Sequence, residues 1–170
     1  MADVKLHAPE PSASLLSLRD EGLREGMELL YFAYRDFTSE ADAILDELGF
    51  GRAHHRALHF VARNQGITIM ELLAVLRITK QSLGRVLKDL IEAGLIDRTQ
   101  GAADRRYKHL ALTEQGIVLE RRLSATLKRA IASAYRAAGP DAVTGFRHVL
   151  LELISKDTRA VMDAMAEKRK

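Results

Sequence analysis

Apolar residues recur at the spacing of an α-helix through most of this chain, except over residues 95–113, where the period changes to two. The runs "LIDRTQ" and "RYKHLALT" in that segment predict two short strands, and "GAAD" between them predicts the tip of a hairpin. In the second run, Leu110 and Leu112 alternate with His109 and Ala111, as on a strand with one buried face. One hairpin among helices restricts the chain to a mainly α (α+β) fold.

The segment before the hairpin predicts two short helices joined by a tight connection. Thr68 and Glu71 form a capping-box pattern at the start of the apolar run "ITIMELLAVLRI". The pattern is interrupted over residues 77–79, and Thr79 can cap the next helix, "KQSLGRVLKDLIEAG", which ends at Gly94. A short helix, a tight connection, a second helix and a β-hairpin together form a winged helix-turn-helix.

The flanking segments predict longer helices. A helix from about residue 15 carries apolar residues at alternating steps of four and three from Leu23 to Leu48, which is the pattern of a helix paired along its length. Further helices are expected over 52–64, over 114–138 after a Thr113 cap, and in one piece from Pro140 to the basic end "EKRK". The first helix and the last two have more apolar face than one winged helix could cover.

Composition excludes several kinds of function. The chain has no cysteine, which removes disulfides, thiolate metal sites and Cys nucleophiles. No window has the roughly 18 apolar residues of a membrane span, and the first residues lack the apolar stretch of a signal peptide, so we expect a cytoplasmic protein without a membrane partner. Residues 1–50 carry 4 Lys or Arg against 11 Asp or Glu, whereas residues 51–113 carry 11 against 5. A basic middle segment of this kind suggests a polyanionic partner.

The outward face of the helix that begins at residue 80 is the candidate DNA-reading surface. A recognition helix presents its N-terminal residues to base edges, where Gln pairs with adenine and Lys or Arg pairs with guanine. Ser82 and Thr79 suit phosphates, and Gly84 allows a close approach to the groove. The alternative is an ordinary amphipathic helix, which the capped helix before it and the hairpin after it disfavour. The candidate DNA-binding residues here are Thr79, Lys80, Gln81, Ser82, Gly84, Arg85 and Lys88.

Two stretches resemble the MarR family of bacterial regulators. "DRRYKHLALTEQG" is similar to the family's wing signature, and "ITIMELLAVLRITKQSLGRVLKDLIEAGLIDR" is similar to its helix-turn-helix. The run "GRAHHRALHFVARN" resembles an alphaproteobacterial subgroup of that family. The resemblance implies an intertwined homodimer on a pseudo-palindromic operator, with residues 15–50 and 114–170 as the dimerisation region, 51–113 as the winged-helix lobe and 1–14 as a flexible tail.

The resemblance also assigns roles to the wing. It implies that Arg106 enters the minor groove, that Asp104 holds Arg106 through an ion pair, and that Arg105 and Lys108 contact phosphates. The expected function is a dimeric, sequence-specific regulator that binds double-stranded DNA and represses transcription. The alternative is a winged-helix module for protein–protein contact that uses the hairpin as a docking edge.

A cluster of histidines leaves two further alternatives open. His55 and His59 lie four residues apart on one helical face beside His54 and could share a metal or respond to haem, although the glutamate of an HExxH enzyme motif is absent. They could instead line a cleft for a small aromatic or anionic effector, together with Arg52 and Arg56. We assign no metal site, no cofactor and no catalytic residue, and we expect no enzymatic activity.

Overall fold

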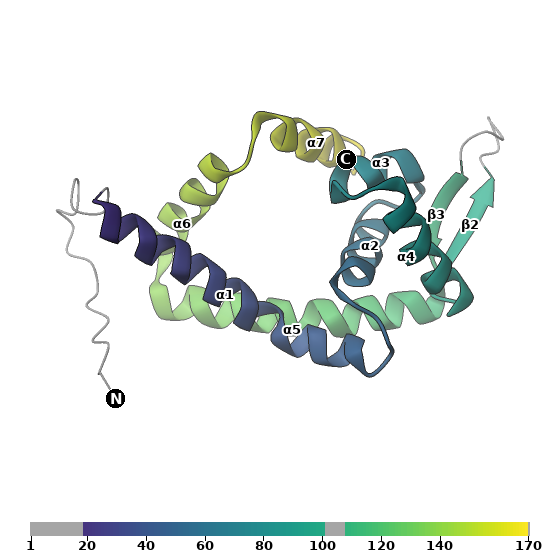
Figure 1. The fold of residues 1–170 in the computed structure, drawn as a ribbon, viewed down its shortest axis with the longest axis horizontal. Helices are drawn as coiled ribbons and strands as arrows, with labels where there is room; N and C mark the ends of the chain where they lie inside the picture. The colour runs from purple at the N-terminus through teal and green to yellow at the C-terminus, as the bar shows by residue number, and fades with distance from the viewer. Residues whose placement is uncertain (1–18, 101–107, 170) are drawn as a thin grey trace. The chain divides into compact units, whose positions relative to one another are not determined.

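The computed structural model describes residues 19–100 and 108–169, which are mainly helical with one small sheet (Figure 1). The predicted fold class, a mainly α chain with a winged helix-turn-helix, is confirmed. The chain divides into two units, and the boundary after Thr38 falls inside α1. The elements in chain order are α1 (Asp20–Asp46), α2 (Arg52–Arg63), β1 (Ile67–Thr68), α3 (Ile69–Leu76), α4 (Lys80–Glu92), β2 (Ile96–Gln100), β3 (Lys108–Leu112), α5 (Glu114–Ala138), α6 (Pro140–Leu153) and α7 (Lys156–Glu167).

The helix-turn-helix is set by the caps that the sequence predicts. Thr68 N–H donates to Glu71 Oε2 at 2.9 Å, and Glu71 N–H donates back to Thr68 Oγ1 at 3.3 Å, so the capping box starts α3. Arg77 ends α3 in the left-handed conformation, with φ of 50°. Thr79 then caps α4, because its hydroxyl accepts the Ser82 N–H at 3.1 Å. These three local features produce the tight connection between the two helices.

The sheet has three antiparallel strands in the order β1-β3-β2. In the predicted alternation of β3, Leu110 and Leu112 are buried, whereas His109 and Ala111 are half-buried. The two-residue strand β1 was not predicted from the sequence. It pairs Ile67 with Leu110 directly after Gly66, whose φ of 76° turns the chain out of α2.

In the unit that begins at Ser39, buried residues from several helices of the same chain form one hydrophobic core. Leu58 on α2, Leu72 on α3, Leu90 on α4 and Leu123 on α5 are all fully buried in it. The start of α5 packs closely against the backbone of Leu95, directly before β2. A Cβ added at Gly116 would lie 2.0 Å from the Leu95 carbonyl oxygen, so glycine is required there.

Two predicted helix boundaries are corrected. The last helix is not continuous, because Ile154 is extended and Ser155 caps a separate helix by accepting the Thr158 N–H at 3.2 Å. The sequence contains this serine cap, but the apolar spacing continues across it. The first helix begins at Asp20 instead of near residue 15, and residues 15–18 lie outside the described part.

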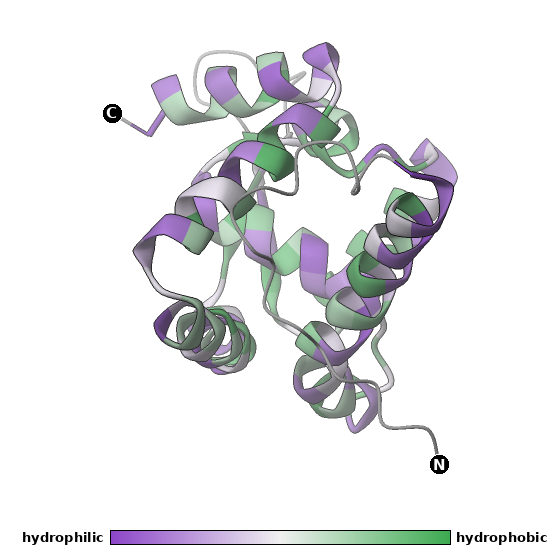
Figure 2. Cartoon of the chain, turned by 90° about the vertical axis from the view of Figure 1, so that its left-hand side faces the viewer, coloured by the Kyte–Doolittle hydropathy of each residue, from purple (hydrophilic) through white to green (hydrophobic). Residues whose placement is uncertain are grey.

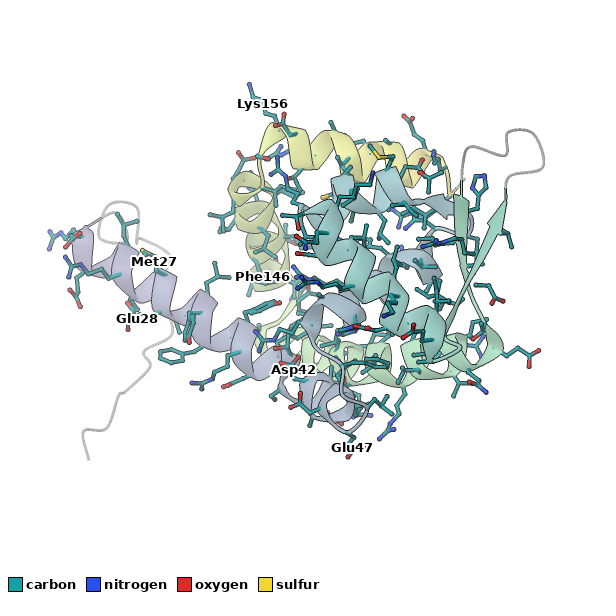
Figure 3. The ribbon with its side chains drawn as sticks, turned by 45° about the vertical axis from the view of Figure 1, so that its right-hand side comes forward. Met27, Glu28, Asp42, Glu47, Phe146 and Lys156 are labelled. Carbon is teal, nitrogen blue, oxygen red and sulfur yellow. The ribbon has the colours of Figure 1, made fainter. Side chains whose placement is uncertain are left out.

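Most of the large apolar side chains that are exposed in the single chain lie on α1 and α6. On α1, Met27 is 72% exposed, and on α6, Leu153 is 64% exposed. Figure 3 shows Phe146 as a side chain standing off α6 and Met27 as one on α1. Within residues 19–100 and 108–169, no helix combines the length and hydropathy that a membrane span requires. The predicted division into a lobe and a dimerisation region concerns an assembly of two chains and stays a prediction.

Candidate nucleic-acid interface

The helix α4 separates an apolar face from a polar one along its whole length. Its buried residues, Leu83, Val86, Leu87 and Leu90, face the core. The seven residues predicted to read DNA are all exposed, as the sequence pattern required: Thr79, Lys80, Gln81, Ser82, Gly84, Arg85 and Lys88. A Cβ at Gly84 would meet nothing within 4 Å, so the fold itself does not require glycine at this position.

The N-terminus of α4 places hydroxyl groups and free backbone N–H groups together. The Thr79 hydroxyl accepts the Ser82 N–H and donates its own proton to Ser82 Oγ at 2.9 Å. The proton of the Ser82 hydroxyl is therefore left to donate outward. The first backbone N–H groups of a helix lack internal partners and carry partial positive charge, which makes this end suitable for a phosphate.

The cations of α4 differ in what they already bind. Lys88 lies 3.8 Å from Glu92, one turn along the helix, and both side chains are well exposed. Lys80 and Arg85 make no ion pair with any residue in the described parts of the chain. Their charges are thus available to an anion, whereas the charge of Lys88 is shared with a neighbouring carboxylate.

His54 connects the start of α2 to the middle of α4. Its Nδ1 accepts the Gly51 N–H at 3.0 Å, so the proton of the neutral ring is on Nε2, which donates to Asp89 Oδ2 at 3.1 Å. Phe50 stacks on the same ring at a centroid distance of 4.9 Å. Sequence reasoning missed this role, because the histidine cluster suggested ligands, and Asp89 is distant in sequence.

The wing is described only at its base. The strands pair Arg98 with Leu110 and Gln100 with Lys108, which brings the base of the hairpin to the same sheet. Asp104, Arg105 and Arg106, predicted at the tip, lie outside the described residues, and for Lys108 only the backbone is described. Arg98 is an exposed cation on β2 that sequence reasoning did not single out.

The residues predicted for an effector cleft all lie on α2, and two of them already contact carboxylates of other helices. Arg52 lies 2.8 Å from Asp42 of α1, whereas His59 Nδ1 lies 3.2 Å from Glu120 of α5. His55 is buried between these contacts, and Arg56 is exposed. Burial lowers the pKa of His55 and the nearby His59 lowers it further, against opposite effects of Asp42 and Glu120.

The histidines also point to different partners. His54 contacts α4 and His59 contacts α5, so each has one carboxylate of its own. Among the residues that the structure describes, no group of three or more His, Asp or Glu side chains is placed to hold a metal ion. These contacts link helices to one another, and they lend no support to the alternative of a metal-responsive or haem-responsive site.

Comparisons with known proteins find a family model, a relative and solved structures that are similar to this chain. The model of the MarR family matches residues 48–106. The HTH-type transcriptional regulator PetP of Rhodobacter capsulatus is 55% identical over 137 residues, which are 81% of this chain and 82% of the relative. A crystal structure of Streptococcus pneumoniae FabT in complex with DNA aligns with a TM-score of 0.70 at 17% identity, covering 77% of this chain and 94% of that one. A MarR family transcription regulator aligns with a TM-score of 0.70 at 22% identity, covering 90% of this chain and 98% of that one. Both structures show likeness of fold.

Proposed function

This chain belongs to the MarR family of transcriptional regulators, and from that premise we propose that it binds double-stranded DNA as a homodimer and represses transcription. The observation that carries the proposal is the N-terminal half of α4, where Lys80, Gln81 and Arg85 are exposed beside a capped helix end. The relative named PetP supports the same class of activity. The proposal places the protein in the cytoplasm and includes no catalytic step.

The division of labour on α4 follows from chemistry. Gln81 offers both a donor and an acceptor, which match the N6 and N7 edge of adenine, and Arg85 matches guanine O6 and N7. Ser82 and the free N–H groups at the helix start would hold a phosphate and so fix the register of the helix in the groove. The His54–Asp89 hydrogen bond supports this assignment, because it links α4 to the start of α2 one turn beyond Arg85.

The homodimer is supported by the open apolar faces. On α6, Phe146, Val149 and Leu153 recur at helical spacing and are exposed in a single chain. Monomeric proteins rarely leave apolar patches of this kind in water, and a two-fold partner would cover them. Two lobes related by such an axis would read a pseudo-palindromic site with half-sites about one helical turn apart, roughly 34 Å.

The family resemblance also assigns roles to the wing and to an effector. Arg106, held by Asp104, would enter the minor groove, and Arg105 and Lys108 would contact phosphates, as the family resemblance implies. Repression would be relieved by a small aromatic or anionic ligand. The residues proposed for that site are Arg52, His55, Arg56 and His59, of which Arg52 and His59 also contact carboxylates of other helices.

The decisive experiment is fluorescence anisotropy with a labelled duplex from upstream of the chain's own gene, measured at two salt concentrations. We expect tight binding whose affinity falls steeply with salt, since each phosphate contact contributes about 0.9 to the log–log slope. Gln81→Ala and Arg85→Ala should each cost about 1–3 kcal/mol at specific half-site bases. Arg121→Ala, which removes an exposed cation from α5, is the matched control and should retain the wild-type affinity.

Two results would contradict the proposal. Salt-insensitive binding, or none, would favour a protein–protein module with the same fold. Wild-type affinity and footprint in Gln81→Ala, Arg85→Ala and Arg106→Ala together would show that DNA, if bound, lies on another face.

A further inference from the structure

The helix α4 carries two pairs of residues in which a cation stands four positions before a carboxylate. Arg85 precedes Asp89, and Lys88 precedes Glu92. Side chains at this spacing lie on one face of a helix and can form an ion pair. Hydrophilic residues alternate with hydrophobic ones along the helices (Figure 2), and all four of these residues are exposed. The two pairs therefore start from the same local geometry.

Only one of these two pairs forms an ion pair within the described residues. Lys88 Nζ lies 3.8 Å from Glu92 Oε1. Arg85 makes no ion pair with any residue in the ranges 19–100 and 108–169, and Asp89 Oδ2 lies 3.1 Å from His54 Nε2 instead. The two pairs thus differ in the histidine that α2 brings to Asp89.

Two other contacts hold His54 in place for Asp89. Its Nδ1 accepts the Gly51 N–H at 3.0 Å, which leaves the proton of the neutral ring on Nε2, the atom next to Asp89. Phe50 stacks on the ring, with the centroids 4.9 Å apart and the planes at 29°. The side chain of His54 is 15% exposed, whereas that of Asp89 is 48% exposed. A fixed and largely buried donor therefore holds a carboxylate that is otherwise open to solvent.

The partner of Asp89 matters because Arg85 is the residue proposed to contact guanine. An arginine that is paired with a carboxylate on its own helix must break that pair, or share its N–H groups, before it binds a base. The hydrogen bond from His54 occupies Asp89 and leaves the five N–H groups of Arg85 available. Lys88 lacks this arrangement, since no histidine contacts Glu92 in the described chain, and its charge is shared.

We propose that His54 is a positioning residue for DNA recognition, which holds Asp89 and so keeps the guanidinium of Arg85 free for a base. The role in DNA binding rests on the function proposed above, whereas the partner of Asp89 is a property of the free chain. Without His54, Asp89 pairs with Arg85 as Glu92 pairs with Lys88.

The expected size of the effect follows from the weakness of exposed ion pairs. A pair at this spacing on a helix surface costs about twofold in DNA affinity when it has to be broken for each recognition helix. The two recognition helices of a homodimer lie far apart, so their costs multiply to about fourfold on one operator. An effect of this size is readily measured by fluorescence anisotropy.

The test compares two substitutions that separate the contacts of His54. In His54→Asn the amide oxygen can still accept the Gly51 N–H, but the side chain is too short to reach Asp89. In His54→Gln the longer amide can still donate to Asp89. With the labelled duplex, His54→Asn should bind about fourfold more weakly than wild type, and His54→Gln should bind as wild type does. His148→Asn, the same substitution at an exposed histidine of α6, is the matched control and should leave the affinity unchanged.

Two further backgrounds distinguish this role from a purely structural one. Arg85→Ala removes the cation that Asp89 would pair with, and Asp89→Asn removes the charge but keeps an acceptor for His54. We expect His54→Asn to weaken DNA binding in neither background. An equal loss in wild type and in both backgrounds would show that His54 only supports the fold, and it would overturn the proposal. His54→Leu, which also lacks the donor, replaces His54→Asn if circular dichroism shows that variant to be unfolded.

The free protein gives a readout that does not depend on DNA. In proton–nitrogen NMR spectra, the Nε resonance of Arg85, assigned through Arg85→Lys, should shift on Asp89→Asn more in the His54→Asn chain than in the chain with His54. Equal shifts would overturn the proposal. If the larger shift appears and the protein binds no DNA, the effect of His54 on Asp89 stands and the proposed function fails. If DNA binds tightly and His54→Asn leaves the affinity unchanged, the role of His54 fails alone.

Discussion

The winged-helix core and the helix α6 use similar apolar residues in opposite ways. In the core, Leu58 and Leu90 are fully buried by neighbours from the same chain. On α6, Phe146 is 43% exposed and Val149 is 59% exposed, although they recur with the same helical period. The apolar residues therefore repeat with the same period in a helix whose apolar face is buried within one chain and in a helix whose apolar face is exposed in one chain.

This difference shows what apolar spacing can and cannot specify. Spacing fixes which face of a helix leaves water, because the side chains repeat every 3.6 residues. It does not state whether the covering surface belongs to the same chain or to a second copy. We therefore expect substitutions in the core to act at any protein concentration, and substitutions on α6 to act through assembly.

The largest effect is expected from the core. Leu90→Ala removes a fully buried side chain and should lower the free energy of unfolding by about 2–5 kcal/mol, since a cavity remains. The control Leu151→Ala truncates a side chain that is 44% exposed on α6 and should change it by less than about 0.5 kcal/mol. Urea denaturation measures both. Similar losses in the two variants would show that α6 is as fully covered as the core.

Charges on the open face of α6 should act on assembly. Val149→Asp with Leu153→Asp puts two carboxylates at the apolar face and should weaken the homodimer by about a hundredfold or more, because charge is costly in a desolvated interface. His148→Asp adds one carboxylate on the opposite side of the helix and serves as the control. Light scattering after size-exclusion chromatography gives the mass. An unchanged mass for the double variant would locate the dimer contact elsewhere.

A smaller effect, on the melting temperature, depends on pH. It is expected from His55, which is buried as the core residues are. The pKa of His55 in the folded chain is lowered by burial below its ordinary value of 6.5, so the unfolded chain binds the proton more readily. The stability contributed by neutral His55 is complete above that ordinary value and is lost as the pH falls below it. The melting temperature should therefore fall between pH 7 and pH 5, and the fall should be shallower in His55→Gln.

The exposed His148 provides the control for that pH dependence. His148→Gln removes an exposed imidazole from α6 and should leave the slope of melting temperature against pH as in wild type. A slope that His55→Gln does not reduce would mean that His55 does not control the acid response.

Local signals in the sequence predicted the fold where one residue determines the geometry. The Thr68 and Thr79 caps and the strand alternation at Leu110 were predictable, because each depends on neighbours within a few residues. The Ser155 cap was available too, but the apolar spacing on both sides of it masked the boundary between α6 and α7.

Contacts between distant segments were not predictable in this way. Nothing near His54 in sequence indicates Asp89, and nothing near Glu71 indicates Lys168. The exposed residues of α4 could be predicted, since exposure follows from the helical period. The contact between His54 and Asp89 could not, because it needs α2 and α4 to meet, and the sequence does not specify how those helices cross.

The smallest expected effect distinguishes stability from binding on α4. Gly84 and Gly145 are both exposed glycines within helices, and a Cβ at either would meet nothing within 4 Å. Gly84→Ala and Gly145→Ala should each stabilise the fold by up to about 1 kcal/mol, because alanine loses less backbone freedom in a helix. Only Gly84→Ala should weaken DNA binding, since its methyl group would stand between α4 and the groove. Thermal melting and anisotropy measure the two quantities separately. If Gly84→Ala binds DNA as tightly as Gly145→Ala does, α4 does not approach the groove at Gly84.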